Sequence, residues 1–179
     1  MKKQVWFLDV DGVFNIYQKH LERSPVFAAF KVSCWPIPMA RQLVLAIDDD
    51  RQIHPAWLSC WDRSSILWNE LALTRHFPVG YHLSSAQEKY AHTLFPEYVG
   101  KRVDGKLIAA RYYLRKFPER EVIWIEDGFM PETEEWSKQE GRVKLIDTTQ
   151  ETIREMLLGE DNLEDRAREF MGMCKDKKV

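Results

Sequence analysis

Short apolar runs alternate along the chain with stretches that have helical periodicity. The runs at residues 4–8, 56–60, 79–83, 121–125 and 142–146 are predicted strands, each followed by a polar or glycine-containing segment. Strands that alternate with helices predict a parallel sheet covered by helices on both faces. We therefore expect an α/β fold, and sheets of this kind bind their ligands at the carboxyl ends of the strands.

The predicted helices lie between these strands and after the last of them. They cover residues 39–50, 62–77, 106–117, 131–140 and 163–171. Ser85 and Glu88 have the spacing of a capping box ahead of a further predicted helix, "KYAHTLF". Thr148 and Glu151 have the same spacing, which predicts that Thr148 caps the helix at "TIREMLL". Residues 16–38 break the alternation and predict a two-stranded hairpin flap over the site. We expect 1–179 to be one domain, with a C-terminal helix and tail at about 160–179.

Composition narrows the class of protein. Apolar residues make up 45% of the chain and charged residues 30%, as in ordinary globular proteins, and the formal net charge of -2 argues against a strongly basic nucleic-acid surface. The 3 cysteines lack the spacing of a metal site and indicate reduced thiols in a cytoplasmic protein. No apolar run is long enough to cross a membrane. We expect neither a membrane partner nor an obligate protein partner.

Two predicted strands end in acidic residues. Asp9 and Asp11 follow the first strand, and Glu126 and Asp127 follow the strand at 121–125. An Asp-Val-Asp-Gly step alone is also compatible with a polar turn. Two acidic strand ends, however, would crowd negative charge into one crevice, which is costly unless a cation neutralises it. Ligands that are all oxygen favour Mg²⁺, so the pattern indicates a magnesium site.

The geometry of a strand end suggests different roles for the two aspartates. Asp9 can point at the metal, stay ionised and act as a nucleophile, while Asp11 can hold a proton as general acid and base. Gly12 allows the backbone to bring amide hydrogens to a phosphate. Ser59 could donate to a phosphoryl oxygen and Lys106 could stabilise negative charge. A cap or a solvated side chain is the alternative for these last two residues.

These residues resemble, in order, the four motifs of the haloacid dehalogenase-like phosphohydrolases. The motifs are Asp-Val-Asp-Gly-Val at 9–13, Ser59 after an apolar strand, Lys106 before a helix, and Glu126-Asp127 after "VIWI". The resemblance covers about residues 4–148. The segment "AWLSCWDRSSILWNEL" is similar, more narrowly, to small members of that superfamily associated with nucleic-acid repair.

The resemblance implies a Rossmann-like sheet in the order 3-2-1-4-5 with Asp9 on the central strand. It implies that Asp9 becomes an aspartyl-phosphate and that Asp11 protonates the leaving group and then activates water. Ser59 and Lys106 would hold the phosphoryl group, and Lys101 competes with Lys106 for that role. Mg²⁺ would be held by Asp9, the backbone carbonyl of Asp11 and Asp127. Glu126 stands where many relatives have Asp, so the division between Glu126 and Asp127 stays open.

The expected function is hydrolysis of a phosphate monoester by a Mg²⁺-dependent phosphatase. The short connections leave no room for a large cap domain, so the expected substrates are a phosphorylated small molecule, such as a nucleotide, or a nucleic-acid end. The aromatic side chains that could stack a base or pack in the core are Trp35, Trp57, Trp61 and Phe129. The rival hypotheses are a metal-dependent phosphotransferase and a phosphorylatable regulatory module.

Overall fold

The computed structural model describes residues 4–10, 12–17, 34–59, 93–99 and 104–176. The strands are β1 (Gln4–Leu8), β2 (Asn15–Tyr17), β3 (Cys34–Pro36), β4 (Ile53–Trp57), β5 (Glu121–Glu126) and β6 (Val143–Asp147). The helices are α2 (Ala40–Asp49), the short 3₁₀ helix η1 (Pro96–Tyr98), α5 (Gly105–Lys116), α6 (Pro131–Glu140), α7 (Glu151–Leu158) and α8 (Leu163–Lys175).

Four of the strands form a parallel sheet in the order β4-β1-β5-β6. This confirms an α/β fold with a parallel sheet flanked by helices. In chain order the expected strands are numbered 1 to 5, and β4, β1, β5 and β6 correspond to expected strands 2, 1, 4 and 5. The expected third strand, at 79–83, lies outside the described residues, as do the predicted helix at 62–77 and the capping pair Ser85 and Glu88.

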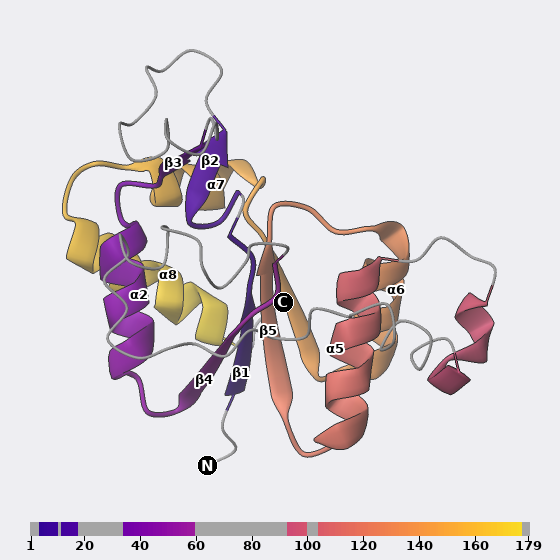
Figure 1. The fold of residues 1–179 in the computed structure, drawn as a ribbon. Coiled ribbons are helices and arrows are strands. Elements are labelled where there is room, and N and C mark those ends of the chain that lie inside the picture. The colour runs from indigo at the N-terminus through magenta and orange to yellow at the C-terminus, as the bar shows by residue number, and fades with distance from the viewer. Residues whose placement is uncertain (1–3, 11, 18–33, 60–92, 100–103, 177–179) are drawn as a thin grey trace.

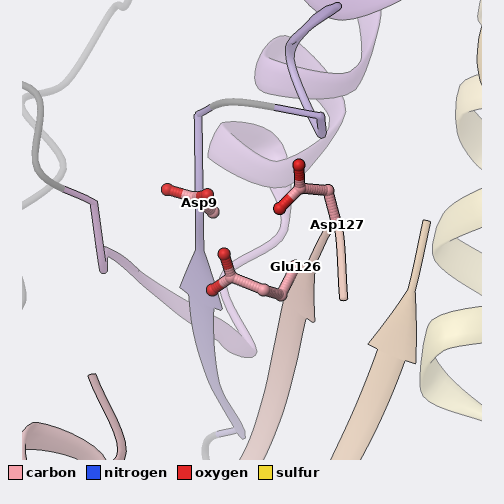
Figure 2. A group of neighbouring side chains, drawn as sticks. All are labelled: Asp9, Glu126 and Asp127. Atoms are coloured by element: carbon pink, nitrogen blue, oxygen red, sulfur yellow. The ribbon is translucent and has the colours of Figure 1, made fainter. Parts of the chain in front are cut away.

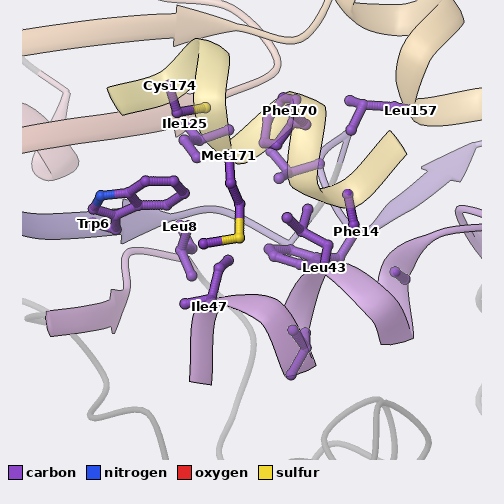
Figure 3. Close-up of a cluster of buried hydrophobic side chains, with 14 of the residues drawn as sticks. Trp6, Leu8, Phe14, Leu43, Ile47, Ile125, Leu157, Phe170, Met171 and Cys174 are labelled. Carbon is purple, nitrogen blue, oxygen red and sulfur yellow. The ribbon is translucent and has the colours of Figure 1, made fainter. Parts of the chain in front are cut away.

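Helices cover both faces of the sheet (Figure 1). On one face, α2, α7 and α8 pack against a core that includes Trp6, Leu8 and Ile125 (Figure 3). On the other face, α5 covers a second cluster that includes Phe7 and Trp124, and α6 lies beside it. Alternate residues of β1 and β5 thus face opposite layers, as strand geometry requires. Both faces are apolar, so the sheet is buried like other all-parallel sheets.

A separate two-stranded antiparallel sheet joins β2 to β3. Ile37 donates its amide hydrogen to Phe14 O at 2.9 Å just beyond the pair, and both residues are fully buried. The pair lies beyond the carboxyl ends of the main strands (Figure 1). Residues 18–33, which the predicted flap includes, lie outside the described residues.

Several element boundaries differ from the sequence-based prediction. β4 runs over Ile53–Trp57 and not over 56–60, although Pro55 has no amide hydrogen to contribute to a strand ladder. α8 extends to Lys175. The prediction that Thr148 caps a helix is wrong, because Gln150 is the N-cap of α7 and its side chain makes no capping bond. Within the described residues, no helix has both the length and the apolar composition that crossing a bilayer requires.

Candidate active site at the carboxyl ends of the strands

The register of the sheet places two acidic residues side by side. Leu8 of β1 pairs with Ile125 of β5, so the next residues, Asp9 and Glu126, are neighbours across the strands. The Asp9 amide continues the ladder by donating to Ile125 O at 3.1 Å. Both side chains are almost fully buried, at 4% and 6% relative exposure. Each lies two residues after an aromatic residue of the cluster under α5, so both carboxylates point towards that helix.

Asp127 completes a group of carboxylates. One carboxylate oxygen from each of Asp9, Glu126 and Asp127 can be chosen so that all lie within 4.8 Å of one another. Figure 2 shows the three side chains converging just past the ends of β1 and β5. Asp9 and Glu126 are buried, whereas Asp127 is exposed. The donor set is therefore all oxygen, and these three carboxylates could hold a metal ion.

Lys106 carries the positive charge at this site. Its ammonium nitrogen Nζ lies 3.0 Å from Asp9 Oδ2 and 2.5 Å from Glu126 Oε1. The residue stands in the first turn of α5, whose N-cap Asp104 accepts the Lys106 amide hydrogen at 2.9 Å. A cation in a first turn opposes the helix dipole. The two carboxylates therefore compensate for a position that the helix alone disfavours.

The crowding of charge alters the titration of the buried groups. Burial and the neighbouring Asp9 carboxylate raise the pKa of Glu126 to about 9, against the opposing effect of Lys106. Burial disfavours the charged form of Lys106, but the Asp9 and Glu126 carboxylates outweigh that effect and raise the pKa of Lys106 above its ordinary value. In the absence of another cation, the site thus favours an ammonium at Lys106 and a proton at Glu126. A divalent cation would compete with that proton.

The turn after β1 needs a glycine. Gly12 adopts a φ of 71°, in the left-handed region that glycine occupies at little cost. A Cβ atom built at Gly12 would lie 2.1 Å from Asp127 Cβ, so a larger residue would displace the acidic side chain. The glycine expected to approach a phosphate therefore also gives Asp127 its place beside the turn.

Two residues of the site were not predicted to belong to it, and Thr148 was predicted only as a helix cap. Trp124 donates its indole hydrogen to Glu126 Oε2 at 3.1 Å, on the same face of β5. Thr148 donates its hydroxyl to backbone oxygens of both Gly12 and Glu126. The two-residue spacing of Trp124 and Glu126 on a strand is a signal that could have identified the first contact. Nothing local in the sequence indicates the second.

The remaining predicted residues divide into described and undescribed ones. Ser59 is buried two residues past the end of β4, the strand next to β1, and lies at the same edge of the sheet as Asp9. Asp11 and Lys101 lie outside the described residues. Of the aromatic residues that could stack a base, Trp57 is buried against Phe14 with a ring separation of 5.3 Å. Phe129 is half-buried, with its ring edge-on to Trp124 at 5.5 Å.

Comparison of the chain with protein-family models, with curated proteins and with solved structures finds no match in any of the three.

Proposed function

We propose that this chain is a Mg²⁺-dependent phosphatase that hydrolyses a phosphate monoester through an aspartyl-phosphate on Asp9. The observation that carries the proposal is the position of Lys106, whose ammonium contacts Asp9 and Glu126 while Asp127 lies beside them. A buried carboxylate next to a lysine and further acids is arranged to meet a phosphoryl group and a metal ion. A turn alone would require none of these contacts.

In the proposed reaction, a carboxylate oxygen of Asp9 attacks phosphorus as the bond from phosphorus to the ester oxygen breaks. Asp11 gives its proton to the leaving oxygen and later takes a proton from water. That water attacks phosphorus, the bond to Asp9 breaks, and inorganic phosphate and the Asp9 carboxylate are released. Lys106 stabilises negative charge on the transferring group, and Ser59 donates a hydrogen bond to it.

The carboxylate oxygens of Asp9 and Asp127 would hold Mg²⁺ together with the Asp11 backbone carbonyl. Both oxygens of Glu126 already accept hydrogen bonds, from Lys106 and from Trp124, so Glu126 mainly orients Lys106. Bound Mg²⁺ would withdraw charge from the phosphoryl oxygens and offset the excess of carboxylates.

The full architecture that goes with this function is a five-stranded sheet in the order 3-2-1-4-5, with residues 16–38 forming a flap and no large cap domain. Such a thinly covered site suits a bulky phosphate ester, namely a nucleotide or a phosphorylated nucleic-acid end. Assays with nucleotides and with oligonucleotides phosphorylated at the 5′ or 3′ end would separate these substrate classes.

The decisive experiment is the Asp9→Asn variant, assayed for hydrolysis of an aryl phosphate with Mg²⁺ and with excess chelator. We expect a rate loss of at least about 10³-fold in the variant, because the amide is a poor nucleophile, and loss of wild-type activity in chelator. The melting temperature of the variant should not fall. One of the two buried carboxylates is removed, and Lys106 still pairs with Glu126.

The matched control is Asp161→Asn, which changes an exposed aspartate paired with Arg166 and should leave turnover unchanged. Hydrolysis by Asp9→Asn at the wild-type rate would overturn the nucleophile assignment. A long-lived phospho-protein without multiple turnover would instead indicate a regulatory module.

A further inference from the structure

Thr148 joins three segments of the chain at the end of the sheet. It directly follows β6, and its side chain is buried at 3% exposure. Its hydroxyl Oγ1 lies 2.8 Å from Gly12 O and 3.2 Å from Glu126 O, although Gly12 is 136 residues away in the chain. Its amide donates to Glu126 O at 2.9 Å. One residue thus contacts both the turn after β1 and the end of β5.

The hydrogen-bonding capacity of these groups indicates which contact the hydroxyl proton serves. A threonine hydroxyl has a single hydrogen to donate. Glu126 O already accepts a hydrogen from the Thr148 amide, and Gly12 O is the nearer oxygen. The hydroxyl proton therefore goes mainly to Gly12 O. Since the residue is buried, water does not readily replace this bond if it is lost.

The contact fixes the position of Gly12 in the turn that follows Asp9. Gly12 directly follows Asp11 and packs against the Asp127 side chain, so movement of its carbonyl would change the separation between the β1 turn and Asp127. The hydrogen bond from the Thr148 amide to Glu126 O holds Thr148 to the end of β5. Thr148 thus connects the turn after β1 to the end of β5 through these two hydrogen bonds.

We propose that Thr148 is a positioning residue, which holds the turn after β1 at the distance from Asp127 that the metal and the phosphoryl group require. This inference rests on the proposed function and deepens it. The capping-box spacing with Glu151 does not account for Thr148, because α7 begins one residue after its N-cap Gln150. The Thr148 hydroxyl contacts the turn after β1 and does not cap α7.

The test compares Thr148→Val, which keeps the shape and removes the donor, with Thr148→Ser, which keeps the donor. Two quantities are measured, the affinity for Mg²⁺ alone by calorimetric titration and kcat for an aryl phosphate. Loss of a group that orients metal ligands costs about 10- to 100-fold in affinity or activity. We expect Thr148→Val to lose roughly tenfold or more in both quantities, and Thr148→Ser to stay within about twofold of wild type, in line with this rule.

The control is Ser137→Ala, which removes another buried hydroxyl that donates to a backbone oxygen, Glu134 O, at 2.8 Å within α6. It should leave Mg²⁺ affinity and kcat unchanged, because the bond lies away from the carboxylates. If Thr148→Val fails to fold, Thr148→Cys, whose thiol is a weaker donor, should give a weakened Mg²⁺ affinity.

Wild-type Mg²⁺ affinity in Thr148→Val or Thr148→Cys would overturn the inference, as would a loss in Thr148→Ser equal to that in Thr148→Val. These outcomes are distinct from failure of the proposed function. If the wild-type protein hydrolyses no phosphate ester, the proposed function fails, but the Mg²⁺ titration still tests the role of Thr148.

Discussion

Two lysines form ion pairs with carboxylates in different parts of this molecule. Lys106 lies between Asp9 and Glu126, whose side chains are only 6% and 8% exposed. Lys175, near the end of α8, pairs with Asp50 after α2, and these side chains are 39% and 21% exposed. The chemical groups are the same, but the second pair is matched one to one and lies partly in water.

The difference bears on which of the two lysines we propose to take part in chemistry. At the surface, one positive and one negative charge connect the ends of two helices that already pack through the core. At the strand ends, one lysine of the described residues faces two buried acids, with Asp127 as a third nearby. A matched pair satisfies itself, whereas an excess of buried carboxylates favours a further cation. Predictions that separate the two lysines therefore test the assignment of the site.

The largest expected difference is between Lys106→Met and Lys175→Met. The first variant leaves buried carboxylates without their ammonium partner, so we expect a loss of about 3 kcal/mol in the free energy of unfolding measured in chelator. It should also lower kcat for an aryl phosphate by at least about 10²-fold, as loss of a group that stabilises the transition state does. Lys175→Met should cost about 1 kcal/mol or less and leave kcat unchanged.

Urea titrations and steady-state assays of both variants provide the measurements. Equal losses of stability and activity in the two variants would show that the buried network is an ordinary structural ion pair. Recovery of Lys106→Met stability by added Mg²⁺ would agree with the site, because a cation substitutes for the missing ammonium.

A pH effect is expected in the wild-type protein, where Lys106 remains in place. The pKa of Glu126 is raised from 4.5 to about 9 by burial and by Asp9, so the folded protein binds a proton that the unfolded chain has released. This contribution to stability is complete below pH about 4.5 and is lost as pH rises towards about 9. In chelator, the urea midpoint of the wild-type protein should therefore fall over this range.

Glu126→Gln tests that explanation, since the amide is neutral at every pH. Its urea midpoint should vary less than that of the wild-type protein across the same range. If the two proteins show the same slope between pH 5 and pH 9, another group is responsible.

The sequence was sufficient to predict the parallel α/β fold. It was also sufficient to predict that one edge of the sheet carries Asp9, Glu126, Asp127 and Lys106. These predictions succeed because strand alternation and parallel topology are repetitive features, and because the carboxyl ends of parallel strands lie at one edge of the sheet. Thr148 could not be predicted in the same way, because its capping-box spacing is a local pattern and its partner Gly12 lies 136 residues away.

The start of β4 shows another limit of sequence patterns. Pro55 interrupts the apolar run and favours a strand that begins after it, yet Ile53 and His54 already pair with β1. The neighbouring strand decides this boundary, and the neighbour is not adjacent in sequence. Pairing with Gln4 and Val5 thus outweighs the local preference of the proline.

The smallest expected effect concerns the surface pair and has the opposite pH dependence. Burial opposes ionisation of Asp50, but hydrogen bonds from Lys175 and from the Gln52 amide outweigh it and lower the pKa of Asp50 below 3.8. Its stabilisation is therefore present above pH 3.8 and is lost as pH falls through the lowered folded pKa. Asp50→Asn should be less stable than wild type by about 1 kcal/mol or less at pH 6, with the gap closing in acid. Urea midpoints at pH 6 and near pH 3 measure that gap. A stability gap that widens in acid would show that Asp50 is not held ionised by Lys175. The Lys175–Asp50 pair could then no longer serve as the matched surface pair with which the buried site is compared.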